Sequence, residues 1–209
     1  MMHDTLTLRR AGPADVDTLA AMDKRCFHAP WSRESFRQEM QHDELAYYII
    51  GELGGRAVGY AGLWIIADEG HINNVGVLPE YRRRGIAAEI LERLFADARR
   101  LGAHDFTLEV RVSNTEAIRL YRRFGFEPEG VRPGYYEDDH EDALIMWRRE
   151  RPGEAAPQPP GGTRENADEE DEAEKAGRHG DGRSGDGHSR DGRRGDGRGE
   201  DGGEKRNRR

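Results

Sequence analysis

The stretch that decides the fold is residues 75–87, which read VGVLPEYRRRGIA. Its first part is apolar and β-branched, a pattern typical of a strand, and Pro79 ends that strand. From Gly85 onward the apolar residues recur at helical spacing as far as Leu101, with charged residues on the opposite face. Three arginines stand at the junction. The sequence therefore predicts a strand, a turn and a long helix in direct succession.

The junction has the features of an anion site. Free N–H groups at a helix start, the positive end of the helix dipole and nearby guanidinium groups all favour phosphate. Gly85 lets a ligand approach the backbone where a Cβ would intrude. A simple cluster of surface charge is the alternative interpretation. Nucleotide hydrolysis is not expected, because the sequence contains no Gly-Lys-Ser/Thr of the Walker type.

Upstream of this unit, strand-like and helix-like segments alternate. A helix opened by Pro13 is followed by a second helix, for which Ser32 is a good N-cap. Two β-branched and aromatic runs then flank a Gly-Gly pair, which is a hairpin signal. The expected strands are Thr5–Arg9, Ala46–Leu53, Ala57–Ile66 and His71–Leu78.

Downstream, the pattern predicts one more helix and three strands. Phe106–Val110 is the first strand, and Ser113–Glu116 has the spacing of a capping box that opens a helix closed by Gly125. Phe126–Val131 and Ala143–Trp147 are the last two strands. The order is strand, two helices, three strands, helix, strand, helix, two strands. This order is typical of a mixed α/β domain with one long crossover helix.

The last 59 residues have a different composition. Residues 151–209 contain no Val, Ile, Leu, Met, Phe, Tyr, Trp or Cys, and their only apolar side chains are five alanines. We therefore expect one domain over residues 1–150 and a disordered, Gly/Asp/Arg-rich tail over 151–209, because the tail buries too little to offset its ordering entropy. Its two Gly-x-Gly-x-x-Gly matches, at 180–185 and 197–202, follow no strand and open no helix, which argues against a dinucleotide site.

Composition excludes several classes of protein. The net charge is −8, so the basic excess of a nucleic-acid-binding protein is missing. Cys26 is the only cysteine and lies on an apolar helix face, which predicts a buried, inert thiol. The acidic run Asp138–Asp142 predicts a solvated loop, with some attraction for a cationic peptide, in preference to a metal site. We expect a cytoplasmic protein with no membrane partner, no specific nucleic acid and no bound metal.

Two segments resemble a known family. Arg82-x-x-Gly85-x-Ala87 after an apolar strand is similar to the R/Q-x-x-G-x-G/A pyrophosphate loop of the GNAT superfamily of N-acetyltransferases. Residues 108–126, LEVRVSNTEAIRLYRRFGF, resemble the second half of that fold. The likeness covers about residues 5–148, and it is greatest to the branch that acetylates protein N-termini, including ribosomal-protein-alanine and archaeal N-terminal acetyltransferases. Further segments that look like this branch are Pro30–Ser32, Tyr135–Tyr136 and His140–Ala143.

The resemblance implies a fold and a co-substrate. The fold is a mixed, mostly antiparallel sheet with one splayed pair of parallel strands, flanked by helices. Acetyl-CoA would lie in the gap between those strands, near 75–78 and 106–110, with backbone groups on the pantetheine and the arginine loop on the pyrophosphate. Asn114 would add a contact while also capping its helix. The implied cofactor residues are Val75, Gly76, Val77, Arg82, Arg83, Arg84, Gly85, Ile86, Ala87 and Asn114.

The resemblance also implies catalytic and substrate-binding residues. Glu109 matches the general base that deprotonates the amine, directly or through a water, and a solvated strand residue is the alternative. Tyr121 matches the acid that protonates the departing sulfur of coenzyme A, and a core tyrosine is the alternative. Tyr135 and Tyr136 would lie in a loop that covers the substrate, and Trp31 would shape its first side chain.

The implied function is transfer of acetyl to the N-terminal α-amine of proteins, with ribosomal proteins among the candidate partners. Three other readings stay open at this point. The same chemistry could act on a lysine side chain or a small-molecule amine. A non-catalytic module that binds coenzyme A is the second, although the intact Glu109/Tyr121 pair argues against it. The third is an RNA-associated protein that uses the Arg-Gly tail.

Overall fold

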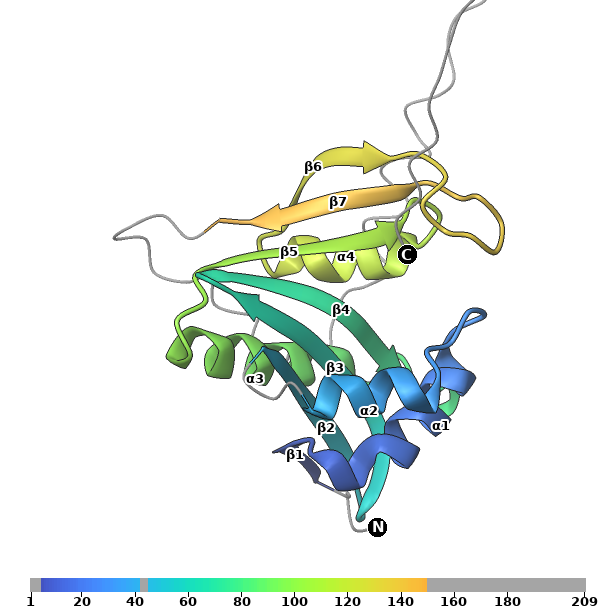
Figure 1. The fold of residues 1–209 in the computed structure, drawn as a ribbon, viewed down its shortest axis with the longest axis vertical. Helices are drawn as coiled ribbons and strands as arrows, with labels where there is room; N and C mark the ends of the chain where they lie inside the picture. Colours follow the sequence, from blue (N-terminus) through green and yellow to red (C-terminus); the bar gives the residue numbers. More distant parts are fainter. Residues whose placement is uncertain (1–4, 42–44, 150–209) are drawn as a thin grey trace, which may run out of the picture. The chain divides into compact units, whose positions relative to one another are not determined.

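The computed structural model describes residues 5–41 and 45–149, so the tail expected over 151–209 lies outside the described part. Within it, seven strands and four α-helices follow one another in the order that the sequence predicts (Figure 1). The strands are β1 (Leu6–Arg10), β2 (Ala46–Leu53), β3 (Arg56–Ile66), β4 (Glu69–Val77), β5 (Asp105–Arg111), β6 (Glu127–Arg132) and β7 (Ala143–Arg148). The helices are α1 (Val16–Cys26), α2 (Arg33–Gln41), α3 (Ile86–Arg100) and α4 (Thr115–Arg123), with 3-10 turns at Pro13–Asp15 and Pro79–Tyr81. None of the described helices has the length and hydropathy that a membrane span needs.

Short-range signals position several of these elements as predicted. Gly54 and Gly55 both have positive φ, 56° and 77°, the combination that a two-residue hairpin turn requires between β2 and β3. Ser32 caps α2, because its Oγ accepts a hydrogen bond of 3.0 Å from the Ser35 N–H. The hairpin and the second helix are therefore confirmed where local chemistry predicts them.

The cap of α4 differs from the predicted capping box. Asn114 is the N-cap, and its Oδ1 accepts a hydrogen bond of 3.1 Å from the Ala117 N–H. Ser113 has another role, since its backbone N–H donates to Glu141 Oε1 at 2.8 Å. Glu116 does not complete a box either, because it forms an ion pair with the arginine loop at 2.9 Å. Long-range partners thus override the local S-x-x-E signal.

The seven strands form one sheet in the order β1-β2-β3-β4-β5-β7-β6. Neighbouring strands are antiparallel except β4 and β5, which are parallel and are joined through α3. A parallel pair needs such a crossover, and here the helix predicted after residue 85 supplies it. The fold is the mixed α/β arrangement that the sequence predicts.

Two cores hold the helices to opposite faces of the sheet (Figure 1). On one face, α3 and α4 pack over a ring cluster in which Phe95 lies 4.9 Å from Phe106 and 5.5 Å from Phe124, measured between centroids. On the other face, α1 and α2 cover the fully buried Tyr48 and Tyr60. Full burial of each such aromatic ring stabilises the fold by about 2 kcal/mol relative to exposure. The two helical layers therefore fix the sheet from both sides.

The parallel pair separates part of the way along its length. Residues Glu69–Ile72 of β4 pair with Asp105–Leu108 of β5, and beyond them the described register of β4 continues only with β3. The register with β3 also shifts at this place, leaving Asn73 as an extra residue in β4. A bulge of this kind bends its strand. Figure 1 shows β4 and β5 diverging from this region, and we call the space between them the split.

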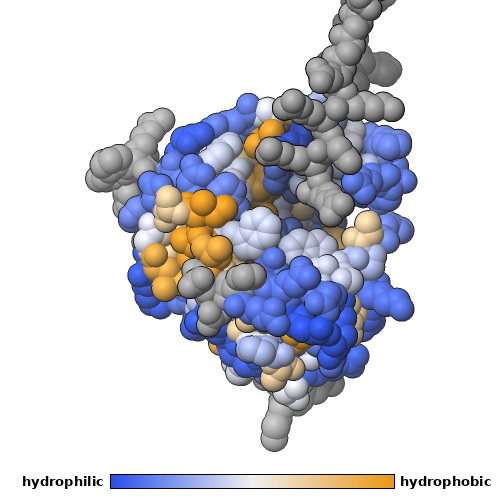
Figure 2. All heavy atoms as spheres, in the orientation of Figure 1, coloured by the Kyte–Doolittle hydropathy of each residue, from blue (hydrophilic) through white to orange (hydrophobic). Residues whose placement is uncertain are grey.

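Exposed apolar side chains gather at the closed end of the split. Leu45, Trp64 and Ile66 are exposed, and all three lie where β3 ends and β4 begins. The face shown in Figure 2 is otherwise mainly hydrophilic, with a group of hydrophobic residues on the side where β3 ends. This rim lies away from the carboxyl ends of β4 and β5, where the predicted site residues are found.

Candidate active site

β4 forms one wall of the split. Val75, Gly76 and Val77 pair with β3 on one side, so their other side faces the space that β5 leaves. Gly76 is required here, because a Cβ would approach Tyr60 Cε1 to 2.8 Å and Cys26 Sγ to 3.3 Å. Burial raises the pKa of the partly buried Cys26 thiol, in keeping with the inert role expected for it. The structure thus brings the three predicted strand residues together on one wall.

The arginine loop continues from this wall into α3. Gly85 is the N-cap of α3, with a left-handed φ of 81°, and Arg83 also has positive φ, 62°. Arg82 Nε donates to the Val77 carbonyl at 3.0 Å, and Arg84 donates to the Glu80 carbonyl at 3.1 Å. These bonds shape the loop backbone and leave all three arginine side chains at the surface.

The start of α3 fits a pyrophosphate. The first N–H groups of an α-helix have no acceptor within the helix, and here they belong to Ile86, Ala87 and the residue that follows. Because the Ile86 side chain is buried in the core, only its backbone is available to a ligand. Arg83 bridges the loop to α4 through Glu116, which brings Asn114 at the start of α4 into the same neighbourhood.

β5 forms the other wall and carries the predicted base. Leu108 and Val110 are buried toward α3 and α4, so the pleat directs Glu109 between them to the opposite face. Its side chain is 31% exposed, and Oε1 lies 3.2 Å from Arg132 Nη1. The Arg132 guanidinium also lies 5.0 Å from the ring centroid of Tyr135. A cation therefore rests beside Glu109 on an aromatic ring, in a place open to solvent.

Arg111 ties the loop of residues 133–142, between β6 and β7, to the end of β5. Its guanidinium lies 2.6 Å from Asp138, 2.8 Å from Asp139 and 3.0 Å from Glu141. It also lies 3.9 Å from the ring centroid of Tyr136. Asp138, Asp139 and His140 are exposed, in agreement with the predicted solvated loop, and Arg111 in addition holds its carboxylates together. Within the described residues no group of His, Cys, Asp and Glu has the geometry of a metal site.

Tyr136 lies close enough to Tyr121 to influence its ionisation. Tyr121 on α4 is 7% exposed, and burial raises its pKa, with a further contribution from Tyr136. Burial also raises the pKa of Tyr136 to about 12, where Arg111 opposes the shift and Glu109 adds to it. Both phenols are therefore protonated at neutral pH. Tyr136 is thus within electrostatic reach of both the predicted acid and the predicted base, although Tyr121 and Glu109 lie toward opposite faces of the sheet.

The loop of residues 27–32, between α1 and α2, begins beside the β4 wall, because Cys26 at its start lies over Gly76. The Trp31 backbone N–H donates to Asp23 Oδ2 at 2.5 Å, and its ring packs on Phe36 with 5.7 Å between centroids. The two loops thus flank the split from opposite walls. Trp31 comes from the β4 side, and Tyr135 and Tyr136 come from the β5 side.

Three residues of this arrangement escaped the sequence reasoning. Asp23 had a signal, since it occupies a core-facing position of a helix whose buried residues include Leu19 and Met22. Arg111 and Arg132 had none, because their partners lie 23 to 30 residues away along the chain. A lone arginine in a strand pattern does not reveal which carboxylate it contacts.

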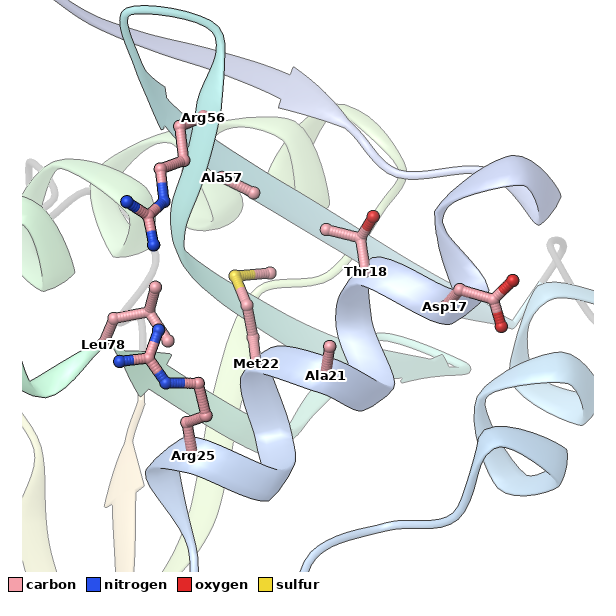
Figure 3. A pocket seen from close by; sticks show the side chains of 8 residues that line it. All are labelled: Asp17, Thr18, Ala21, Met22, Arg25, Arg56, Ala57 and Leu78. Carbon is pink, nitrogen blue, oxygen red and sulfur yellow. The ribbon is translucent and has the colours of Figure 1, made fainter.

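A hollow of about 400 Å³ lies elsewhere, between α1 and the strands beside it (Figure 3). Arg25 and Arg56 extend into it from opposite sides, with Leu78 between them in this view. None of the predicted site residues belongs to its lining, and Arg25 is engaged in a 3.0 Å ion pair with Glu80. The lining residues are Asp17, Thr18, Ala21, Met22, Arg25, Arg56, Ala57 and Leu78. The predicted site residues therefore lie around the split and not around this hollow.

Comparisons with known proteins agree with this geometry. Residues 16–126 match the model of the acetyltransferase (GNAT) family. The ribosomal protein bS18-alanine N-acetyltransferase of Escherichia coli (strain K12) is 30% identical over 142 residues, which are 67% of this chain and 95% of that protein. A relative from Bacillus subtilis (strain 168), provisionally named as the same kind of enzyme, is 38% identical over 146 residues, 70% of this chain and 97% of the relative.

One solved structure is similar at both levels. The crystal structure of the ribosomal-protein-S18-alanine N-acetyltransferase from Escherichia coli superposes with a TM-score of 0.64 at 30% identity, over 68% of this chain and 92% of that one. An N-alpha-acetyltransferase of Sulfurisphaera tokodaii is 30% identical over 152 residues, 66% of this chain and 90% of that protein. The likeness therefore extends over nearly the whole length of each of these proteins.

Proposed function

The chain belongs to the GNAT family of acetyltransferases, with acetyl-CoA as acetyl donor, and we propose that it acetylates the N-terminal α-amine of proteins. One observation supports this most directly: an accessible carboxylate on β5 and a buried, protonated phenol on α4 are both within electrostatic reach of Tyr136. Glu109 faces the open side of β5, and Tyr121 lies within the core on α4. The names of the relatives point to the same acceptor, and ribosomal proteins are the first candidates.

In the proposed reaction each of the two groups moves one proton. Acetyl-CoA supplies the acetyl group as a thioester. Glu109 accepts a proton from the α-ammonium, directly or through a water, and the free amine then forms the new C–N bond at the acetyl carbonyl. Tyr121 donates its proton to the sulfur as the C–S bond breaks, and the raised pKa keeps that proton in place until then. As the C–S bond breaks, the nitrogen releases its second proton, which restores the Tyr121 phenol, so the products are the acetylated amine, free thiol and one proton on Glu109.

The pKa of the amine favours an α-amine over a lysine side chain, and one contact indicates where the acceptor cation can rest. An α-ammonium has a pKa of about 8 and a lysine one of about 10.4, so a carboxylate can assist the first far more readily near neutral pH. The cation of Arg132 beside Glu109 and on Tyr135 occupies the kind of place that an α-ammonium would take. The acceptor would reach it between the loops 27–32 and 133–142.

A panel of acceptors tests the proposal. Hexapeptides with different first residues, the same peptides with a blocked N-terminus and an internal lysine, and a polyamine are each incubated with acetyl-CoA and the full chain. We expect release of coenzyme A with unblocked peptides at a rate at least about tenfold above the others, given the difference in amine pKa. Faster transfer to lysine or to the polyamine would contradict the proposed acceptor.

We also propose that residues 1–150 carry the activity. Every residue assigned a role above lies within them, and residues 151–209 contain no aromatic or large aliphatic side chain with which to complete a site. A chain ending at residue 150 is expected to keep its kcat and both KM values within about twofold, since it retains every group that moves a proton. Loss of transfer in that chain would assign a catalytic role to the tail.

A further inference from the structure

Asp23 is the most completely buried carboxylate near the split. Its side chain lies on α1, and the residue is 1% exposed. Oδ1 accepts a hydrogen bond from the Tyr60 hydroxyl, and Oδ2 accepts one of 2.5 Å from the Trp31 backbone N–H. Burial raises the pKa of this carboxyl, and the two hydrogen bonds oppose the rise. A buried carboxylate is costly unless its oxygens are satisfied, so these two donors account for its presence.

The two donors belong to different parts of the site. The Tyr60 ring lies directly over Gly76, in the β4 wall that is expected to hold the acetyl end of the donor. Trp31 lies near the end of the loop 27–32. Its ring packs on Phe36, and this contact fixes its side chain but not its backbone. Asp23 therefore joins the wall to the loop through one rigid group. Within the described residues, neither Glu109 nor Tyr121, the two residues of the proposed proton transfers, has a hydrogen bond that joins the β4 wall to the loop 27–32.

We propose that Asp23 is a positioning residue for acceptor recognition. It holds the Trp31 backbone at a fixed height above β4, so that Trp31 bounds the subsite for the first side chain of the acceptor. The carboxylate acts through Trp31 and touches no reacting atom. The identity of the acceptor rests on the proposed function, whereas the position of the loop rests on the contacts of Asp23 alone.

Two substitutions of similar shape separate hydrogen bonding from packing. In Asp23→Asn the amide oxygen can still accept from the Trp31 N–H, and the amide NH₂ can donate to the Tyr60 oxygen, so the link is preserved. In Asp23→Leu neither bond can form. Tyr48→Phe is the matched control, because Tyr48 is another fully buried tyrosine of the same core whose hydroxyl donates to Glu39 at 3.1 Å.

We expect Asp23→Leu to raise the acceptor KM about tenfold or more, as loss of a hydrogen bond to a charged group implies. The acetyl-CoA KM should stay within about twofold of wild type, because the arginine loop is untouched. The order of preference among first residues of the acceptor should also change. Asp23→Asn should restore the wild-type KM and preference, and Tyr48→Phe should leave both unchanged.

The opposite outcomes overturn the inference. In the first, Asp23→Leu leaves the acceptor KM and the acceptor preference unchanged. In the second, Asp23→Leu raises the acceptor KM and the acetyl-CoA KM together. In the third, Asp23→Asn is as impaired as Asp23→Leu. If lysine peptides or polyamines prove to be the acceptors, the proposed function fails, and the same kinetics on those amines still test the role of Asp23.

If Asp23→Leu does not fold, hydrogen exchange on the wild-type chain decides. We expect the Trp31 amide to exchange at least about 100-fold more slowly than that of His28 in the same loop, because a buried carboxylate accepts its hydrogen bond. Equal exchange at Trp31 and His28 would overturn the inference.

Discussion

The two loops that flank the split are held by opposite kinds of electrostatics. The loop 27–32 on the β4 side depends on a buried carboxylate, Asp23, which accepts from two neutral donors. The loop 133–142 on the β5 side depends on Arg111, which is 24% exposed and pairs with three carboxylates. Salt screens hydrogen bonds inside a core little, whereas it screens exposed ion pairs, which are also lost when acid protonates their carboxylates. The loop 27–32 is therefore held by buried hydrogen bonds, and the loop 133–142 is held by ion pairs.

The chemistry is divided between the walls in the same way. The β4 side continues into the arginine loop and is expected to bind the donor, and the β5 side carries Glu109 with Tyr121 nearby. Substitutions in the arginine loop should therefore change binding of acetyl-CoA, and those on the β5 side should change proton transfer or binding of the acceptor.

The largest effects are expected for the two proton-transfer groups. Glu109→Gln and Tyr121→Phe should each lower kcat about 100-fold, because each removes a proton acceptor or donor while keeping the shape of the side chain. Steady-state release of coenzyme A measures this, with Glu127→Gln on β6 as a carboxylate control at an exposed position. Wild-type kcat in both variants would remove them from the mechanism.

Next in size is the donor side. Arg84→Ala should raise the acetyl-CoA KM about tenfold with little change in kcat, since a guanidinium beside the pyrophosphate stabilises the bound donor before and during the reaction alike. The control is Arg37→Ala. Arg37 is another surface arginine, on α2, and pairs with Glu34. A rise in the acceptor KM instead would show that the arginine loop serves the other substrate.

A smaller effect is expected for Arg111, which holds the loop 133–142 on the β5 side. Arg111→Gln should raise the acceptor KM roughly fivefold and leave the acetyl-CoA KM unchanged, because only the loop 133–142 loses its anchor. Added salt should raise the acceptor KM of the wild type more than that of the variant, as screening weakens the same ion pairs. Arg149→Gln, which breaks a 2.8 Å pair with Glu129 on the distant β6 edge, is the control. Equal salt dependence in wild type and Arg111→Gln would mean that charge does not hold this loop.

The smallest effect is expected when the pH is lowered, and it concerns the ion pairs of the loop 133–142. The Ser113 hydroxyl, the Ser113 N–H and Arg111 lower the pKa of Glu141. The Glu141 N–H and Arg111 lower the pKa of Asp139. A lowered pKa in the folded state stabilises it above the unfolded value of about 4, and this stabilisation is lost as pH falls through the folded pKa. The pKa of Asp23 shifts the other way, so acid adds a proton there without loss of stability.

The Ser113 amide, which donates to Glu141 Oε1 at 2.8 Å, should therefore lose protection against hydrogen exchange between pH 7 and about pH 3. Over the same range the Trp31 amide should keep its protection, because its acceptor stays buried and bonded. Parallel loss at both amides would contradict the contrast between the loops.

The sequence predicts those parts of the molecule whose causes are local. Periodicity and short-range chemistry predict the order of strands and helices along the chain, the crossover helix, the Gly54-Gly55 turn and the Ser32 cap. The bulge at Asn73, which helps to open the split, leaves no trace in the pattern of the strand. Asn114 displaces Ser113 as a cap because a distant glutamate takes the Ser113 N–H.

The candidate site divides in the same way. Residues of the arginine loop, Glu109 and Tyr121 could be named through resemblance to a family, and their catalytic roles stay predictions. The groups that hold the two loops could not, because contacts such as that of Arg132 with Glu109 join residues far apart in the chain. Asp23 is intermediate, since an acidic residue on the apolar face of a helix already indicates a buried partner.

In the proposed reaction an α-amine is acetylated in the split with Glu109 as base. A peptide with a free N-terminus and one internal lysine tests it, with the acetylated position mapped by tandem mass spectrometry for wild type and Glu109→Gln. We predict acetyl on the α-amine in the wild-type reaction and about 100-fold less of it with the variant. Acetyl on the lysine, or undiminished transfer by Glu109→Gln, would contradict the claim.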